Sequence, residues 1–482
     1  MISRRIQEKI ASFLSREKGT IFKDPGGKIS VCLVYPNTYH VGMSNLGFQG
    51  IYTLLNDRKD TVCERAFLPD EEDVREYART GMEIVSLESM RPLGEFDIIA
   101  FSVSFENDYP NILRILSMSR ITPRARDRKG AGPLLIMGGA CAFYNPEPVA
   151  DFFDICFAGE AEEMLSEFME TYRHSTSRAD LYEKARDIEG AYLPGLYEIR
   201  YSPLGEIAKR AAYCNAPEKV KRRYVKDISA HSLRQSIVTS ATEFSDMYLA
   251  EAMRGCPWNC RFCVAGHVYK PVRRKDVESL RNELGNAALL TGRIGLIAPS
   301  LTDYPRAMDI LCMEGVEFSI TSLRADRKSA DLISLLKDYR SVSIAPEAGT
   351  ERLRKVVDKR ITEEDIIETS RLILACGIQS LRLYFMAGLP TETERDIQGI
   401  VDLVEKIRGL SAKGKIVLTV STFVPKPFTP FQWHPMEKME VVKSRLKRIK
   451  NGLGTLKGVR VFHDVPKYAY MQGLFAMGDR RI

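Results

Sequence analysis

Three cysteines in the middle of the chain have the residue type and spacing of metal ligands. Cys256, Cys260 and Cys263 follow one another at intervals of four and three residues, in a loop that contains glycine and proline and comes just after the strand-like stretch 247–250. A structural zinc site usually needs a fourth protein ligand, and His267 is the only near candidate. A [4Fe–4S] cluster held by three thiolates would instead leave one iron open to a small molecule.

The residues between these cysteines indicate which kind of metal site they form. The segment reads Cys256–Pro–Trp–Asn–Cys260–Arg–Phe262–Cys263, with an aromatic residue before the last cysteine. This pattern resembles the signature of the radical S-adenosylmethionine (SAM) superfamily at every position of that signature. The resemblance implies that the three thiolates hold a [4Fe–4S] cluster and that SAM chelates its open iron through its amino and carboxylate groups. It further implies that an electron from the reduced cluster cleaves SAM to methionine and a 5′-deoxyadenosyl radical.

Five further segments extend the resemblance over most of the chain, namely 39–47, 133–154, 345–359, 381–397 and 424–435. Together they look like the class of radical SAM proteins that carry an N-terminal cobalamin-binding-like domain. Carried over residue by residue, Phe262 would lie by the adenine, Glu347 would meet the ribose or methionine part of SAM, and Arg382 would approach the SAM carboxylate. For Glu347 and Arg382 an ordinary ion pair at a barrel rim is the alternative.

The N-terminal half of the chain alternates short apolar runs with helical patterns. Helices are expected at 46–56 and 109–118, and strands at 29–35, 97–102, 133–137 and 154–158. Buried apolar strands interleaved with helices predict a doubly wound parallel sheet, Rossmann-like and cobalamin-binding-like, over 29–165. Such sheets bind ligands at the carboxyl ends of their strands. The candidate cobalamin residues at those ends are Tyr39, His40, Ser102, Gly138 and Gly139.

The loop that carries His40 departs from one family pattern. Cobalamin domains that displace the nucleotide base use Asp-x-His-x-x-Gly, whereas here Thr38 stands for the aspartate and Met43 for the glycine. An aspartate of this kind fixes the tautomer of a ligating imidazole. We therefore expect cobalamin, if it binds, to bind without a histidine ligand to cobalt.

A second alternating series begins near residue 245. Strands are expected at 293–298, 317–321, 341–345, 381–387 and 416–423. A helix between two of them starts with the capping pattern of Thr362 and Asp365 and ends before Gly377. Repeated strand–helix units predict a full or partial (β/α) TIM-type barrel over 245–455, with its chemistry at the carboxyl ends of the strands.

Three segments remain outside these two domains. Residues 1–28 form an N-terminal helical segment, in which Ile2, Ile6, Ile10 and Phe13 fall at helical spacing and predict packing on its own domain. Residues 166–244 are polar and mixed and are expected to connect the domains. Residues 456–482 form a C-terminal tail without an obvious finishing element, which leaves room for a C-terminal partner domain.

Composition limits the class of protein. The chain lacks an apolar run long enough to span a bilayer and lacks a secretory signal, and its ten cysteines then indicate reduced thiols and a cytoplasmic location. The net charge of +7 is compatible with an anionic substrate but does not indicate nucleic acid. A basic run near the C-terminus is expected to be the solvated face of a helix; it comprises Lys438, Lys443, Arg445, Lys447, Arg448 and Lys450.

Three functions fit these observations. The first is a cobalamin-dependent methyltransferase that acts on an unactivated carbon of an unknown substrate and takes electrons from a donor such as flavodoxin or ferredoxin. The second is a radical SAM enzyme with a degenerate N-terminal domain that performs a rearrangement, an oxidation or a methylthiolation; methylthiotransferases carry a second cluster on three N-terminal cysteines, for which Cys32, Cys63 and Cys141 are the candidates here. The third is a non-catalytic iron–sulfur sensor or binding module.

Overall fold

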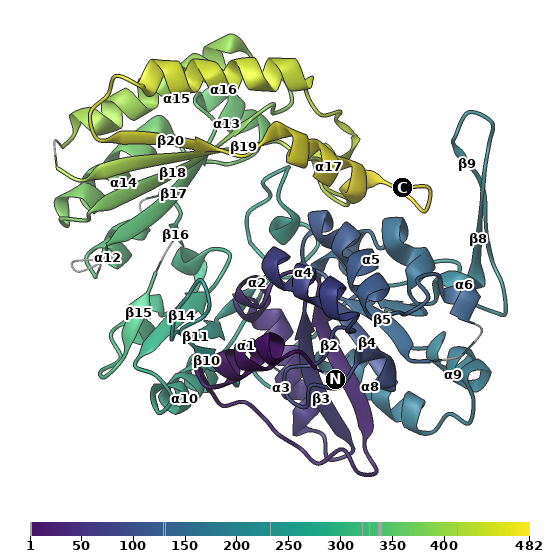
Figure 1. Cartoon of the computed structure of the whole chain (residues 1–482). Helices are drawn as coiled ribbons and strands as arrows, with labels where there is room; N and C mark the ends of the chain where they lie inside the picture. Colours follow the sequence, from purple (N-terminus) through teal and green to yellow (C-terminus); the bar gives the residue numbers. More distant parts are fainter. Residues whose placement is uncertain are drawn as a thin grey trace. The chain divides into compact units, whose positions relative to one another are not determined.

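The chain folds into two compact units. The computed structural model describes residues 2–128, 130, 132–231, 233–320, 322–326, 328–335, 340–411 and 413–482. Unit 1 comprises Met1–Ala250, Leu289–Gly292 and Gly478–Ile482, and unit 2 comprises Glu251–Ala288 and Arg293–Met477. Figure 1 colours both units along the sequence. The main division lies within six residues of the domain boundary expected at 245.

Unit 1 is built on a six-stranded sheet with the order β3-β2-β4-β5-β6-β7. Five of its strands are parallel and β7 (Ala191–Tyr192) is antiparallel to its neighbour; the parallel strands are β2 (Ile29–Tyr35), β3 (Thr61–Phe67), β4 (Ile98–Ser102), β5 (Leu134–Gly138) and β6 (Ile155–Phe157). If the five parallel strands are numbered one to five along the chain, their spatial order in the sheet is 2-1-3-4-5. This is the flavodoxin-like doubly wound order. The strand order reverses between β2 and β4, so the topological switch point of the sheet lies between these two strands.

Strand β3 was not predicted because it carries charged residues in its centre. Its sequence is TVCERAF, and all seven of its residues are buried. The guanidinium of Arg65 is fully buried and pairs with Glu17 at 2.8 Å and with Glu88 at 2.7 Å. A buried charge is tolerated only with such partners, and these lie 48 and 23 residues away in the sequence.

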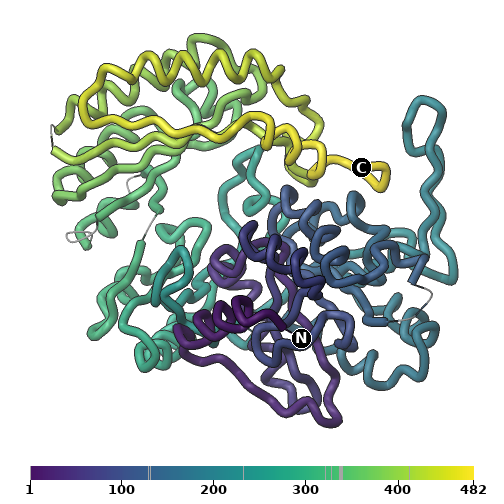
Figure 2. The backbone as a smooth tube through the Cα atoms, viewed as in Figure 1, coloured from purple at the N-terminus to yellow at the C-terminus, as the bar shows by residue number. Residues whose placement is uncertain are grey.

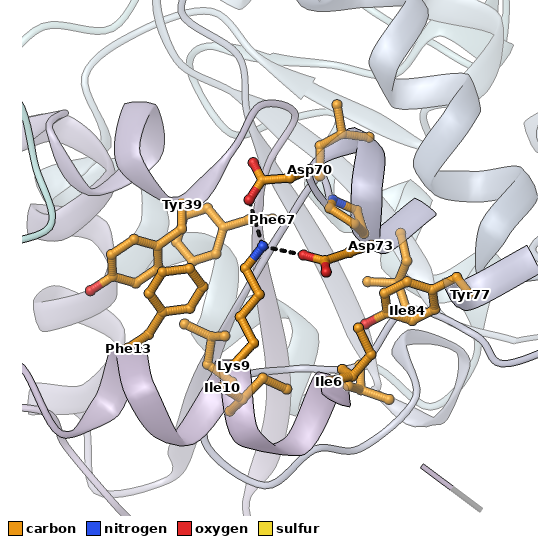
Figure 3. A pocket seen from close by; sticks show the side chains of 14 residues that line it. Ile6, Lys9, Ile10, Phe13, Tyr39, Phe67, Asp70, Asp73, Tyr77 and Ile84 are labelled. Carbon is orange, nitrogen blue, oxygen red and sulfur yellow. Dashed lines mark hydrogen bonds and ion pairs between the residues drawn. The ribbon is translucent and has the colours of Figure 1, made fainter. Parts of the chain in front are cut away.

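The helices of unit 1 cover this sheet. They are α1 (Arg4–Leu14), α2 (Tyr39–Met43), α3 (Leu46–Asp57), α4 (Glu71–Thr80), α5 (Tyr109–Met118), α6 (Ala125–Arg128), α7 (Ala140–Tyr144), α8 (Ala161–Arg173) and α9 (Arg178–Ala185). Ile6 and Ile10 of α1 are buried in the core of the same unit, as their spacing predicts. Figure 3 shows Lys9 of this helix between Asp70 and Asp73, at the edge of a small apolar cavity.

The segment 166–244, expected to connect the domains, belongs to unit 1. It supplies β7 at the sheet edge, the antiparallel hairpin of β8 (Tyr197–Tyr201) and β9 (Ile207–Ala212), and β10 (Val238–Thr239), which pairs with β1 (Glu17–Lys18). Figure 2 traces the hairpin as it extends away from the sheet. At the other end of the chain, Arg480 pairs with Glu147 at 3.0 Å and so ties the last residues to unit 1.

Unit 2 carries the second series of parallel strands. One sheet has the order β16-β17-β18-β19-β20, and β14 (Arg293–Ile297) pairs in parallel with β15 (Glu317–Ser319) in a second, three-stranded sheet. The five strands of the larger sheet are β16 (Ser322–Leu323), β17 (Ser341–Glu347), β18 (Ser380–Ala387), β19 (Lys415–Thr422) and β20 (Val459–His463). For the strands that the structure describes, these parallel sheets are consistent with the predicted (β/α) barrel. The expected tail 456–482 supplies β20.

Helices cover one face of the larger sheet of unit 2 (Figure 1). The helices of the unit are α10 (Val277–Ala288), α11 (Ala307–Leu311), α12 (Ser329–Ile333), α13 (Glu351–Val356), α14 (Glu363–Ala375), α15 (Glu394–Gly409), α16 (Met439–Leu453) and α17 (Pro466–Met477). The predicted capping box of α14 is present, because the Thr362 side chain accepts from the Asp365 N–H and the Asp365 carboxylate accepts from the Thr362 N–H. None of the helices in the described ranges is long and apolar enough to cross a membrane.

The expectation that the whole basic run on α16 is solvated is wrong for Arg445. Its side chain is only 7% exposed and donates to Glu392 Oε2 at 2.9 Å. Glu437 lies 3.3 Å away as a second carboxylate partner. Arg445 is therefore an internal link between α16 and the turn after β18.

Candidate active site

The three cysteines lie on a closed loop of unit 2. Strand β12 (Met253–Arg254) pairs antiparallel with β13 (Arg273–Arg274), so the two ends of the loop between them lie side by side. Within the loop, Cys256 N donates to Ala265 O at 3.2 Å. Gly255 has a φ of +79°, and a Cβ there would lie 2.5 Å from Tyr269 O, so this close approach requires glycine.

All three thiols are free and at least partly buried. Cys260 is buried, and Cys256 and Cys263 are of intermediate exposure. Burial raises the pKa of each thiol, and at Cys260 the positive charges of Lys359 and Arg324 oppose that effect. Over the described residues, no group of three His, Cys, Asp or Glu side chains could hold a single metal ion. A [4Fe–4S] cluster does not require such a group, because each thiolate binds a different iron, and three free thiols on one closed loop fit that donor set.

The loop 255–272, called the cluster loop after the cluster that it is predicted to hold, is fixed to two neighbouring segments. Arg261 N donates to Val357 O at 3.0 Å, at the end of α13, and Phe431 N donates to Arg261 O at 3.2 Å. Phe262, the aromatic residue of the motif, packs against the small core that includes Ala348, Leu353 and Phe431. The structure therefore brings Phe262 close to the segment that follows Glu347.

Glu347 stands at the carboxyl end of β17 in an unusual backbone conformation. Its φ is +67°, and the register between β17 and β18 shifts between Ile344 and Glu347. A left-handed conformation is uncommon for a residue other than glycine and is found preferentially at functional sites. The carboxylate is 13% exposed and pairs with Lys359 at 2.8 Å. It also lies close enough to Cys260 and Cys263 for its charge to raise the pKa of both thiols, after the larger effect of burial.

Arg382 lies farther from the carboxyl ends of the strands than Glu347. In the register of β17 and β18, Arg382 is level with Ser343, whereas Glu347 is level with Phe385. Three residues of strand correspond to about 10 Å. The cations whose charge acts on Cys260 are instead Lys359 and Arg324, which sequence reasoning did not single out. Lys359 lies in a recognised motif and could have been considered, but no sequence signal points to Arg324.

The turn after β18 contains a buried carboxyl group. Gly388 has a φ of +84°, and its N–H donates to Glu392 Oε2 at 2.7 Å. Burial raises the pKa of Glu392 to about 7, although the Gly388 N–H and Arg445 favour its charged form. This arrangement fixes the loop that follows the carboxyl end of β18.

In unit 1, the candidate cobalamin residues fall into two groups. Ser102, Gly138 and Gly139, at the carboxyl ends of β4 and β5, line an apolar cavity of about 70 Å³ that extends between the sheet and helices α3 and α8. Tyr39 instead stacks on Phe13 with ring centroids 4.1 Å apart, and its hydroxyl donates to Glu17. The side chain of Tyr39 is thus part of the core (Figure 3).

His40 and Gly138 differ from expectation in their surroundings. The imidazole of His40 is 54% exposed, and its Nε2 lies 3.4 Å from Glu243 Oε2, so a carboxylate absent from the local motif does lie beside it. Of the two glycines at the end of β5, it is Gly139 that has a positive φ, of +92°. A Cβ on Gly138 would meet nothing within 4 Å, whereas one on Gly139 would lie 2.6 Å from Val103 O.

Two family models match this chain. The model described as "Radical SAM proteins, N-terminal" matches residues 47–194, and the model of the radical SAM superfamily matches residues 251–404. An uncharacterized protein of Methanocaldococcus jannaschii is 29% identical over 94% of this chain and 89% of its own length. The ribosomal protein uS12 methylthiotransferase RimO of Thermodesulfovibrio yellowstonii is 26% identical over 38% of this chain and 48% of its own length.

Among solved structures, the chain is similar in fold to OxsB, a cobalamin-dependent S-adenosylmethionine radical enzyme. The TM-score is 0.51 at 14% sequence identity, over 78% of this chain and 52% of OxsB. The chain therefore spans about half the length of OxsB and of RimO. The thiol loop, the motif segments and the two family matches lead to one conclusion: this chain belongs to the radical SAM superfamily of enzymes.

Proposed function

We propose that this protein is a cobalamin-dependent radical SAM methyltransferase that acts on an unactivated carbon. The observation that carries the radical SAM part is the closed loop of three free thiols beside Glu347. When bound, a [4Fe–4S] cluster on Cys256, Cys260 and Cys263 would present an open iron to SAM and supply the electron that cleaves it.

The protein's own groups would bind and orient SAM. The carboxylate of Glu347 can accept hydrogen bonds from an ammonium group or from ribose hydroxyls, and its backbone conformation fixes its direction. Phe262 offers an apolar surface next to the thiols, where an adenine ring could pack. Lys359 neutralises Glu347 before SAM binds and stays nearby as a partner for the carboxylate of SAM.

The cobalamin part of the proposal is supported by a cavity that reaches the carboxyl ends of β4 and β5 in unit 1. Doubly wound sheets bind ligands outside the carboxyl ends of the strands, and the cavity edged by Ser102, Gly138 and Gly139 lies there. Its lining is mostly apolar, and its volume suits one small part of a large ligand. When bound, cobalamin would carry the methyl group between SAM and the substrate.

Methylthiolation is the second candidate, since relatives such as RimO perform it. A second cluster would need three accessible N-terminal thiols, but Cys32 and Cys141 are 0% exposed and Cys63 is 1% exposed. Cys32 and Cys63 lie inside β2 and β3, within the packed sheet. This burial favours a single cluster and therefore methylation over methylthiolation.

The proposed chemistry also needs a substrate and a source of electrons. The substrate is unknown, and the net charge of the chain is compatible with an anionic one. We propose a flavodoxin or a ferredoxin as the electron donor, because each supplies single electrons to iron–sulfur sites.

The test is anaerobic reconstitution followed by iron and cobalt counts on one sample. We expect about four irons per chain and bound cobalamin in the wild type, and essentially no cluster iron when Cys256, Cys260 and Cys263 are replaced by alanine together. Cys312→Ala, at an exposed cysteine remote in sequence from the loop, is the matched control and should keep its iron. Four irons in the triple variant would disprove the cluster assignment. A cobalt-free wild type with four irons would favour the degenerate-domain alternative.

A further inference from the structure

An arginine outside every recognised motif contacts the cluster loop. The guanidinium carbon of Arg324 lies 3.6 Å from the centroid of the Trp258 ring, and Trp258 stands between Cys256 and Cys260. Trp258 is held in place from its other side, because its Nε1 donates to Asp303 Oδ2 at 2.7 Å. Arg324 follows the short strand β16 and therefore enters the site from a different element than the cysteines.

Arg324 also contacts the segment that carries the partner of Glu347. One of its terminal nitrogens donates to the backbone carbonyls of Lys359 and Arg360, the latter at 3.2 Å. The guanidinium thus bridges the tryptophan of the cluster loop and the chain after α13. Guanidinium groups suit this role because they are planar, stack on aromatic rings and donate in several directions.

The charge of Arg324 is shielded from water. Its side chain is 7% exposed, and its carboxylate neighbour is Asp326, with Nε and Oδ2 3.3 Å apart. The second cation on this network, Lys328, pairs with Asp303 at 3.0 Å but is 64% exposed. A buried charge acts on its neighbours more strongly than an exposed one, because the effective dielectric constant is lower. Arg324 is therefore the cation of this network with the larger electrostatic effect on the loop.

We propose that Arg324 is a positioning residue that holds Trp258 against the cluster loop and raises the reduction potential of the bound cluster. The reduction potential of an iron–sulfur cluster depends on nearby charge, hydrogen bonds and solvent exposure. A fixed positive charge stabilises the reduced, more negative cluster, and a stacked indole excludes water from the same side. This inference rests on the proposed cluster and goes beyond it, because it assigns a role to a residue outside the cysteine motif.

The test is a redox titration of the reconstituted protein, followed by the EPR signal of the reduced cluster, with iron counted on each sample. Arg324→Gln removes the charge, and we expect a more negative midpoint potential than in the wild type at equal iron content. Arg324→Lys keeps the charge and should lie closer to the wild type. Lys328→Gln removes an exposed charge of the same network and should move the potential much less.

A second variant changes the charge without touching the stack. Asp326→Asn removes the carboxylate beside Arg324 and should move the midpoint potential in the positive direction. If Arg324→Gln does not retain iron, this variant decides the question. An unchanged potential at full iron content in Arg324→Gln, or in Asp326→Asn, would overturn the inference. A wild-type protein without cluster iron would instead contradict the proposed function.

Discussion

Glu347 and Lys359 form a largely buried ion pair, with Lys359 Nζ 2.8 Å from Glu347 Oε1. The pair joins the carboxyl end of β17 to the chain that follows α13. Their charges act on Cys260 in opposite directions, since Lys359 lowers and Glu347 raises the pKa of that thiol. The pair therefore lies beside one thiol of the predicted cluster site.

Glu347→Gln should weaken the binding of SAM. The substitution keeps the size of the side chain but removes a charged hydrogen bond, which is worth about 1.5–3 kcal/mol, or roughly 10- to 150-fold in the dissociation constant. An anaerobic titration of the reconstituted protein with SAM measures this change. Glu364→Gln, an exposed carboxylate on α14, serves as the control and should bind SAM like the wild type. Unchanged affinity in Glu347→Gln would return Glu347 to the role of a simple ion pair.

The stability of the protein should depend on pH through Glu392. Burial raises the pKa of this carboxyl group from 4.5 to about 7, so the folded state holds the proton more tightly than the unfolded state. The contribution to stability is full below about pH 4.5 and is lost as the pH rises through about 7. The free energy of unfolding should fall by up to about 3 kcal/mol over this range.

Urea unfolding at several pH values between 5 and 8 measures this dependence. Glu392→Gln cannot ionise but still accepts hydrogen bonds from Gly388 and Arg445, so its stability should vary less with pH. An equally steep pH dependence in the variant and the wild type would show that other groups are responsible.

Gly138 and Gly139 should respond differently to substitution. Gly139→Ala places a Cβ against the backbone of Val103 at a φ of +92° and should destabilise the fold by about 1–3 kcal/mol. Gly138→Ala has open space and should change the free energy of unfolding little. Denaturant unfolding of both variants tests the contrast, and equal losses would contradict it.

Gly138→Leu should preserve the fold but fill the cavity at the ends of β4 and β5. The expected result is a loss of cobalamin occupancy at near-normal stability, measured on protein purified without air after growth with the vitamin. Ser119→Ala, at a residue that does not line the cavity, is the control. Full occupancy in Gly138→Leu would argue that the ligand does not enter this cavity.

His40→Ala should leave cobalamin retention and its visible spectrum nearly unchanged. His40 is exposed, and its observed partner is the carboxylate of Glu243 on the surface of unit 1. The measurement is the absorption spectrum of the cobalamin-loaded wild type and variant. Loss of a cobalt–nitrogen signature in the variant would instead identify His40 as a ligand that Glu243 orients.

The sequence alone was enough to predict features that depend on residues close together along the chain. The spacing of Cys256, Cys260 and Cys263 was enough to predict a cluster-binding loop, and the apolar periodicity of β2, β4 and β5 was enough to predict a doubly wound sheet. The capping box of α14 was predicted for the same reason, since its donors and acceptors are three residues apart. Such signals depend on neighbours along the chain and can be read without the fold.

Other features were decided only by tertiary structure, because their stabilising partners are distant in the sequence. From the sequence, Arg65 and Arg445 would be expected on the surface. In the structure both are buried, and they pair with carboxylates 23 to 53 residues away. Strand β20 completes a sheet from a segment expected to be a tail. Arg324 reaches Trp258 only because β16 and the cluster loop meet in space. A buried charge is stable only where folding supplies its counter-charge, and a sequence pattern does not contain that information.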